Sequence, residues 1–182
     1  MLWSIVTRRR SLDPSSRFCD PRSVGTLHDT DEITEAQCKV SIIMPNWNGG
    51  GVLKESLESI LEHTRGVDFE LVLVDNGSSD ESRDSIRQLA GQDRRVTAIL
   101  NEDNVYFAKA CNQGYEISRG RYVLIANNDI VLADDAVSRM VEYADRHREA
   151  AVVTPRFVDR DGEPQEFVRR LPTALHVIAH YH

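Results

Sequence analysis

Cysteine is scarce in this sequence: only Cys19, Cys38 and Cys111 occur among 182 residues. Three widely spaced cysteines do not form a disulfide framework, so we expect a protein of a reducing compartment. No apolar run approaches the roughly 20 residues that a membrane-spanning helix needs. The opening MLWSIVTRRR places its apolar residues before its arginines, the reverse of a secretory signal. We therefore expect a cytoplasmic protein, whose basic N-terminus could contact the inner face of a membrane.

The sequence also lacks an excess of positive charge. Lys and Arg total 22 against 29 Asp and Glu, which gives a formal net charge of -7. Nucleic-acid binding rests mainly on basic side chains that neutralise phosphates, so a general nucleic-acid binder is disfavoured. One small anionic ligand in a local pocket remains compatible with this charge.

The common glycine-rich phosphate cradles are missing. The segment NGGGVLKES, residues 48–56, matches neither G-x-G-x-x-G nor G-x-x-x-x-G-K-[ST]. Its glycines are better explained as freedom for a loop before a helix. A dinucleotide oxidoreductase is therefore disfavoured, and a bound diphosphate would need another partner, such as a divalent cation. A sugar-phosphate nucleotidyltransferase is disfavoured too, because this loop contains no arginine.

Residues 1–38 differ in composition from the rest of the chain. They mix Arg, Ser, Pro and Asp without an apolar period, which predicts a flexible arm. Five short, nearly continuous apolar runs follow, at 40–45, 69–75, 96–101, 121–127 and 150–155. Runs of this kind are typical of strands that are buried on both faces.

Amphipathic helical patterns lie between these runs. Apolar stripes at helical spacing are formed by Leu53, Leu57, Ile60 and Leu61, and by Val137, Met140, Val141 and Ala144. Ser78 and Glu81 have the spacing of a capping box at the start of another helix. A further helix carries the small residues Ala108, Ala110, Cys111 and Gly114, which predict close approach to the sheet and a packing role for Cys111. The alternation of strands and helices predicts an α/β fold, with a mostly parallel sheet between helical layers.

Polar residues follow four of the five runs. Ligands of open α/β sheets bind beyond the carboxyl ends of the strands. There the sequence places Asn and Asp, in the segments 45–48, 75–77, 101–104 and 127–129. Any one segment is compatible with a turn, but four on one edge indicate a polar pocket. Since Mg²⁺ and Mn²⁺ often use one or two carboxylates together with waters and phosphates, Asp129 is a candidate metal ligand, supported by Asn127.

Three segments together resemble family 2 glycosyltransferases of the GT-A fold, in particular the bacterial rhamnosyltransferase-like branch. They are VSIIMPNWNGGGVLKESLESIL, LVLVDNGSSDES and NEDNVYFAKACNQGYEISRGRYVLIANND. The resemblance covers about residues 39–175 and implies one Rossmann-like, three-layer αβα domain that binds a nucleotide sugar. It implies metal-dependent transfer of a sugar from a UDP- or dTDP-sugar donor to a hydroxyl of a saccharide or lipid-linked acceptor, with inversion. The biological setting it implies is cell wall or polysaccharide biosynthesis.

The resemblance also implies the site residues. Nucleotide-sugar binding is assigned to Pro45, Asn46, Trp47, Asp75, Asn104, Lys109, Asn112, Asn127 and Asn128. Asp75 would accept a hydrogen bond from the N3–H of uracil or thymine. Asp129, at the position of the family's Asp-x-Asp motif, would bind Mg²⁺ or Mn²⁺. Three simpler roles stay open: Lys109 as a solvated helix residue, Trp47 as a cover for the sheet edge, and Asp75 as the cap of a turn.

The sequence departs from the family pattern in two places. Relatives have Gly at the position of Tyr106, where a positive φ would strain a tyrosine. No acidic motif that could supply the general base follows residue 160, and Asp159, Asp161 and Glu163 are interpreted as a hairpin turn. We therefore expect the fold to be incomplete at the C-terminus, with residues 176–182 a truncated tail and the acceptor half and base missing. A non-catalytic nucleotide-sugar-binding fragment or degenerate copy is the alternative.

Overall fold

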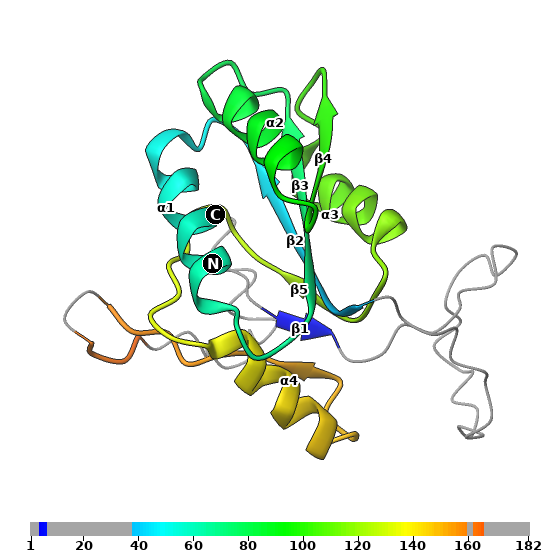
Figure 1. Ribbon diagram of the computed structural model, residues 1–182, viewed down its shortest axis with the longest axis vertical. Coiled ribbons are helices and arrows are strands. Elements are labelled where there is room, and N and C mark those ends of the chain that lie inside the picture. The colour runs from blue at the N-terminus through cyan, green and yellow to red at the C-terminus, as the bar shows by residue number, and fades with distance from the viewer. Residues whose placement is uncertain (1–3, 7–37, 160–161, 166–182) are drawn as a thin grey trace, which may run out of the picture.

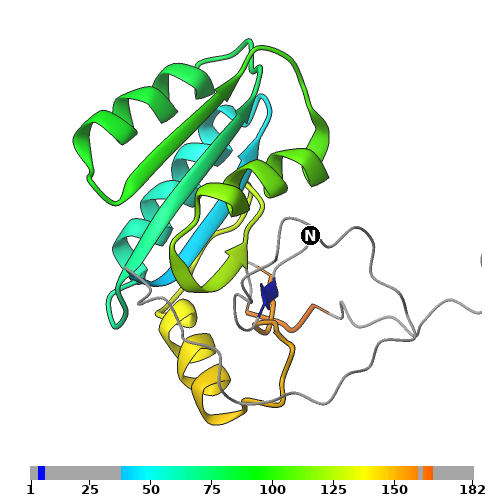
Figure 2. The same cartoon turned by 90° about the vertical axis from the view of Figure 1, so that its right-hand side faces the viewer.

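The computed structural model describes residues 4–6, 38–159 and 162–165. In this part of the chain a six-stranded sheet lies between helices on both faces (Figures 1 and 2). The strands are β1 (Ser4–Val6), β2 (Cys38–Asn46), β3 (Phe69–Asn76), β4 (Val96–Asn101), β5 (Gly120–Ile125) and β6 (Val152–Val153). The helices are α1 (Gly50–His63), α2 (Ser82–Gln92), α3 (Tyr106–Ile117) and α4 (Ala136–Arg146). Strands β4, β3, β2 and β5 lie side by side and run parallel, which confirms the predicted α/β fold.

The sheet continues beyond β5 in a way that the sequence does not predict. β1 pairs antiparallel with β5, with Ile5 opposite Leu124, and β6 pairs antiparallel with β1. Ser4–Val6 thus joins the sheet, although an apolar segment of three residues is too short to show a period. Residues 7–37 and the tail 176–182 lie outside the described residues, so the arm, the tail and the domain limits stay predictions.

Residues 157–159 pair with residues 162–165 as the two arms of a short hairpin. The backbone N–H of Asp159 donates to the carbonyl of Glu163 over 2.9 Å, and Val158 bridges Pro164 in antiparallel fashion. The interpretation of Asp159 and Glu163 as turn residues is confirmed, and Asp161 lies outside the described residues. In the part of the chain that the structure describes, no helix is both long and apolar enough to cross a bilayer.

The two faces of the sheet have separate apolar cores. On one face Ile42, Leu71 and Leu124 pack with α1, α2 and α4, whose predicted stripes contribute Leu57 and Val141. The opposite face packs against α3 through a smaller cluster of Ile43, Val72, Val74, Ala110 and Val123. Successive residues of each central strand therefore enter different cores, which explains why the predicted runs are continuously apolar.

The close approach of α3 depends on its small residues. A Cβ atom on Gly114 would lie 2.5 Å from Cγ2 of Ile43 in β2. Cys111 is also buried, and burial raises the pKa of its thiol to about 11. The thiol is therefore protonated at neutral pH, as expected for the packing residue that the sequence predicts.

A buried charged network joins the amino ends of β2, β3 and β5. Oε1 of Glu70 accepts hydrogen bonds of 2.5 Å from the Ser41 hydroxyl and from the backbone N–H of Arg119. Nε of Arg119 donates to Oε2 of Glu70 over 2.9 Å, and the Gly120 N–H donates to the Ser41 hydroxyl over 2.7 Å. Burial alone would raise the pKa of Glu70, but the hydrogen bonds from Ser41 and Arg119 outweigh it and lower the pKa below its ordinary value of 4.5.

This lowered pKa makes the stability of the domain depend on acid. Because the folded-state pKa of Glu70 lies below the unfolded one, its contribution is present above pH 4.5 and is lost as the pH falls through the folded-state value. We expect Glu70→Gln to reduce the free energy of unfolding by about 2 kcal/mol at pH 7. Urea unfolding from pH 7 to pH 3 should show the two proteins converging in acid. A pH-independent difference would contradict this.

The contact at Gly114 yields a second prediction. Gly114→Ala should lower the free energy of unfolding by about 2 kcal/mol, because the added methyl group overpacks the α3–β2 contact. Gly91→Ala is the matched control: Gly91 also lies in a helix, α2, but a Cβ there meets no atom within 4 Å. This control should be stabilised by up to about 1 kcal/mol, since alanine favours the helix. Equal urea midpoints for the two variants would show that the Gly114 contact is not tight.

Candidate functional site

The polar strand ends meet at the carboxyl edge of the sheet, as the parallel order requires. Asn46 of β2 lies opposite Asp75 of β3, and Asn76 lies opposite Asn101 of β4. The loop after β5 brings Asn128 to the same edge, where its amide contacts Asn46. The prediction that these side chains share one edge is confirmed.

The side chain of Asn46 connects three segments of this edge. Its Nδ2 donates to Oδ1 of Asp75 and to the hydroxyl oxygen of Ser78, both over 3.1 Å. Its Oδ1 accepts from Nδ2 of Asn128 over 2.7 Å. With only 1% of its surface exposed, Asn46 is a buried bridge that uses its amide as both donor and acceptor. The sequence identifies the residue but not this bridging role.

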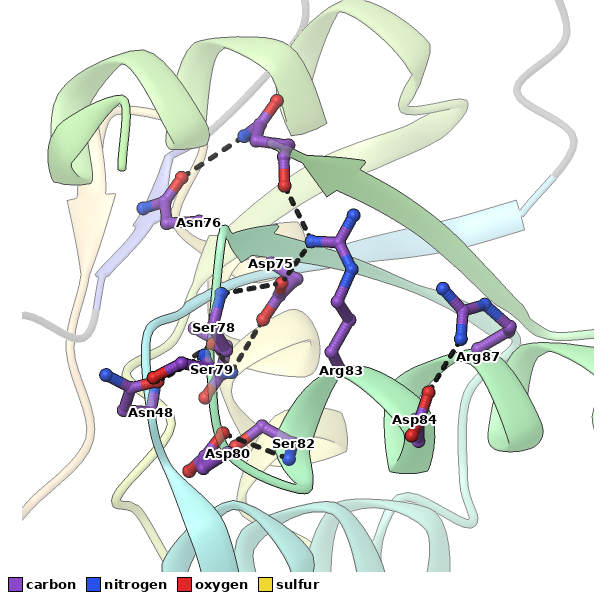
Figure 3. A network of polar contacts seen from close by, with 12 residues as sticks. Asn48, Asp75, Asn76, Ser78, Ser79, Asp80, Ser82, Arg83, Asp84 and Arg87 are labelled. Carbon is purple, nitrogen blue, oxygen red and sulfur yellow. Dashed lines mark hydrogen bonds and ion pairs between the residues drawn. The ribbon is translucent and has the colours of Figure 1, made fainter. Parts of the chain in front are cut away.

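Asp75 is enclosed by hydrogen-bond donors and is fully buried (Figure 3). Besides the bond from Asn46 to Oδ1, its Oδ2 accepts from the Ser78 backbone N–H over 3.1 Å and from Nη1 of Arg83 over 3.0 Å. Nη1 of Arg83 also donates to the carbonyl of Asn101 over 2.6 Å. Arg83 is absent from the predicted site. The signal was available, because a buried carboxylate needs a counter-charge and Arg83 is the first basic residue after Asp75.

The loop between β2 and α1 is bonded to the loop between β3 and α2 (Figure 3). The Asn48 N–H donates to the hydroxyl oxygen of Ser78 over 2.9 Å, and Oδ1 of Asn48 accepts from the Ser79 N–H over 2.8 Å. The predicted capping box is wrong: α2 begins at Ser82 after Glu81, which makes no side-chain cap bond. The Ser78 hydroxyl is used between the loops instead.

Asp80 strengthens this cross-link further along the loop. Its Oδ2 accepts from the Gly50 N–H over 2.9 Å, and its Oδ1 accepts from the Ser82 N–H over 3.0 Å. Burial acts to raise the pKa of Asp80, but hydrogen bonds from Ser82 and Gly50 outweigh it and lower the pKa. Asp80 therefore stays ionised at neutral pH and ties the start of α1 to the start of α2.

The remaining predicted site residues at the carboxyl end of β2 differ in accessibility. Pro45 is buried within β2, opposite Val74, so its side chain lines no open surface. The Trp47 side chain is 57% exposed, which leaves an aromatic surface at the rim available to a ligand.

The loop after β5 carries the predicted metal ligand. Asn127 and Asn128 are half-buried, whereas Asp129 is exposed. Since Asn128 is bonded to Asn46, its neighbour Asp129 lies on the same edge as Asp75. The described residues contain no group of three or more His, Cys, Asp or Glu side chains that could hold a metal ion. A single exposed carboxylate still fits an ion whose other ligands are phosphates and waters.

The segment at α3 is placed differently from the rest of the site. Lys109 and Asn112 are exposed on α3 and are not hydrogen-bonded to the network around Asn46. Oδ1 of Asn104 accepts from the backbone N–H of Tyr106 over 2.8 Å. Tyr106 has φ of 65°, so the positive φ that we considered for this position from the sequence is present. Its side chain is 79% exposed. Because the side chain is exposed, it does not crowd the loop, although the positive φ itself strains the backbone of a non-glycine residue.

Gly49 allows the Asn46–Asn128 contact to form. A Cβ atom on Gly49 would lie 2.4 Å from Oδ1 of Asn46 and 2.7 Å from Nδ2 of Asn128. The backbone of Gly49 has φ of -80°, which any residue adopts, so glycine is required here for space.

We expect Gly49→Ala to separate the Asn46 and Asn128 amides and to lower the free energy of unfolding by about 2 kcal/mol. Gly51→Ala is the control, because a Cβ atom on Gly51 meets nothing within 4 Å. Urea unfolding measures the stability, and the NMR signals of the two side-chain amides report the contact. Unshifted amide signals in Gly49→Ala would contradict the steric role.

Comparison with known proteins identifies the family of this domain. The model described as Glycosyl transferase family 2 matches residues 41–179. The Glycosyltransferase GlyG of Streptococcus pneumoniae is 28% identical over 128 residues, which cover 70% of this chain and 42% of that protein. The putative teichuronic acid biosynthesis glycosyltransferase TuaG of Bacillus subtilis is 26% identical over 137 residues, covering 75% of this chain and 54% of its own length. The chain thus spans about half, or less, of these curated relatives.

Solved structures show the same fold. The structure of Staphylococcus aureus TarS 1-349 in complex with UDP-GlcNAc has a TM-score of 0.54 at 22% identity, covering 60% of this chain and 32% of that one. The mannosyltransferase PcManGT from Pyrobaculum calidifontis, in complex with GDP-Man and Mn²⁺, has a TM-score of 0.54 at 21% identity, covering 65% of this chain and 36% of that one. These likenesses support the GT-A architecture. Since the family model matches more than half of the sequence, the chain belongs to glycosyl transferase family 2.

Proposed function

We propose that this domain binds the donor of a sugar-transfer reaction, a UDP- or dTDP-sugar, together with Mg²⁺ or Mn²⁺. The observation that carries the proposal is the Asp75–Asn46–Asn128 network, which places Asp129 on the same edge as Asp75 within a family 2 domain. A nucleotide that spans this edge would meet Asp75 at its base and Asp129 near its diphosphate. Complexes of TarS with UDP and with UDP-GlcNAc support nucleotide-sugar binding by this fold.

Different residues of the edge would contact different parts of the donor and its cation. Trp47 offers an exposed aromatic face for a base or sugar, and the Asp75 carboxylate offers an acceptor for a ring N–H. Asn127 and Asn128 present amides beside Asp129, which would hold the cation through one carboxylate. When bound, the cation supplies positive charge next to the leaving diphosphate. Lys109 and Asn112 would contact the diphosphate only if α3 moved toward it or if the bound ligand extended as far as α3.

The sugar-transfer step itself is proposed for the whole protein. Inverting transfer needs a base that takes the proton of the acceptor hydroxyl as it attacks the anomeric carbon. We assign that base to none of the described residues, and the acceptor is a saccharide or lipid-linked hydroxyl in polysaccharide synthesis. Turnover of UDP-GlcNAc or a dTDP-sugar by this chain would distinguish a transferase from a module that only binds the nucleotide sugar.

The metal role of Asp129 gives a direct test. UDP with Mn²⁺ at about 100 times its Kd should stabilise the domain by about 2.7 kcal/mol. Asp129→Ala should lose the part of this stabilisation that depends on Mn²⁺, because the ion loses its protein carboxylate. Asp134→Ala is the matched control, since Asp134 is an exposed aspartate nearby that pairs with Arg139.

Melting temperatures with UDP, measured with Mn²⁺ and with EDTA, check this prediction. The wild type and Asp134→Ala should lose stabilisation in EDTA, whereas Asp129→Ala should respond equally in both conditions. If UDP stabilised the wild type equally with Mn²⁺ and with EDTA, the metal-binding role of Asp129 would be contradicted, whereas nucleotide binding would still be supported.

A further inference from the structure

Tyr106 combines a strained backbone with an unpacked side chain. Its φ of 65° brings the Cβ atom close to the following carbonyl oxygen, which is unfavourable for an L-residue. Asn48 is the only other non-glycine residue with positive φ in the described ranges, and asparagine adopts this conformation more readily. The Tyr106 side chain is 79% exposed, more than any other large hydrophobic side chain that the structure describes. The fold therefore strains this residue without gaining buried apolar surface.

The loop before Tyr106 holds the strained conformation in place. Oδ1 of Asn104 accepts from the Tyr106 N–H over 2.8 Å. Glu102 packs closely on the loop after β3, since a Cβ atom on Gly77 would lie 2.6 Å from the Glu102 carbonyl oxygen. Strained residues that their surroundings hold in this way cluster at ligand sites.

The start of α3 lies on the same face of the sheet as Asn76 of β3. Asn76 is opposite Asn101 of β4, and Nδ2 of Asn101 donates to Oδ1 of Asn76 over 3.2 Å. Asn101 also exchanges two amide hydrogen bonds of 2.9 Å with Gln113 of α3. Because α3 begins at Tyr106, the tyrosine lies at the carboxyl edge, beside the ends of β3 and β4.

Asn76 leaves one hydrogen-bond donor unused at this place. Only 4% of the residue is exposed, and Figure 3 shows its Nδ2 on the side away from the bond that its Oδ1 accepts. Nδ2 donates to no group in the described part of the chain, but the atom is not closed off from solvent. A buried amide donor without a protein partner calls for an acceptor from outside the fold. A carbonyl oxygen of a ligand would supply it.

The position along the edge indicates which part of a ligand would lie here. The strand order β4-β3-β2-β5 separates the end of β3 from the end of β5 by two strand spacings, or about 10 Å. Asp129, the proposed ligand of the cation and its diphosphate, lies in the loop after β5. A nucleotide whose diphosphate is at Asp129 therefore extends its base across β2 toward β3, where Tyr106 and Asn76 lie.

We propose that Tyr106 is a further residue of the donor site, whose ring stacks on the nucleobase. The inference rests on the proposed function, because it requires a nucleotide at this edge, but it requires no contact with the buried Asp75 carboxylate. Stacking suits an exposed tyrosine, since a flat aromatic ring contacts the face of any base. No packing in the described residues orients the ring, so the held backbone of Tyr106 sets the direction in which the side chain leaves the chain.

This role predicts opposite effects on binding and on stability. Tyr106→Gly and Tyr106→Asn both tolerate positive φ, so neither should melt below the wild type without ligand. Both should bind UDP about tenfold more weakly, the scale of one contact between a base and an aromatic ring. Tyr106→Phe keeps the ring and should restore the affinity. A tyrosine that only packed against the fold would lose stability instead.

Calorimetric titration of the 182-residue chain with Mg²⁺ would compare UDP with 5,6-dihydro-UDP. The dihydrouracil ring keeps the carbonyl and N–H groups of uracil but is not planar, so the tenfold loss should appear with UDP and vanish with 5,6-dihydro-UDP. Ile117→Ala is the matched control, because Ile117 is 43% exposed at the other end of α3. This variant should bind both ligands as the wild type does.

Each contrary outcome overturns a specific statement. If the Gly and Asn variants are folded and bind UDP as tightly as the wild type, Tyr106 does not stack on the base and the proposed function stands. An equal loss with UDP and with 5,6-dihydro-UDP would also overturn stacking on a planar ring. If the wild type binds no UDP, the proposed function fails together with the inference.

A measurement on the unaltered protein covers the case in which the variants fail to fold. In the UDP-saturated chain, nuclear Overhauser effects should connect H5 and H6 of uracil with the ring protons of Tyr106. Stacking places these protons in contact, whereas a base bound elsewhere on the edge does not. The absence of these signals at saturation would overturn the proposal.

Discussion

The buried amide of Asn46 is the interaction on which the candidate site depends. Parallel strands bring their carboxyl ends to one edge, but they do not orient the side chains there. Asn46 does so, because one amide can donate to the Asp75 carboxylate and accept from the Asn128 amide at the same time. Either half of this arrangement alone would leave a buried polar group unpaired, at a cost of about 1–3 kcal/mol. The ends of β2 and β3 and the loop after β5 are therefore mutually fixed.

The two loops beside this bridge are held by hydrogen bonds rather than by apolar contacts. Ser78, Asp80 and Asn48 exchange bonds between the β2–α1 and β3–α2 loops, and Gly49 leaves the space that the amides need. The edge is thus rigid around Asp75, while Asp129 and Trp47 remain accessible. Asp129 and Trp47 are therefore the exposed side chains of this edge at which the proposed cation and nucleotide would be contacted.

Much of this arrangement could be predicted from the sequence, for physical reasons. Strands buried on both faces are continuously apolar, so β2 to β5 were visible, and parallel topology alone placed Asn46, Asp75 and Asn128 on one edge. Other features depend on partners distant in sequence. Ser78 has the spacing of a cap, but its hydroxyl oxygen accepts from both the Asn48 N–H and the Asn46 amide instead. The pairing of Arg83 with Asp75 and of Ser4–Val6 with β5 likewise arises only in three dimensions.

The unequal cores of the two faces have a consequence for motion. In the described part of the chain, α1, α2 and α4 share a cluster of 20 buried apolar residues, whereas α3 is attached through a cluster of five. Local opening free energies follow the apolar area that an element buries. The helix that carries Lys109 and Asn112 should therefore exchange its amide hydrogens with solvent before the central strands do. Its displacement would leave the larger cluster in place but would expose Ile43, Val72, Val74 and Val123 on the opposite face of the sheet.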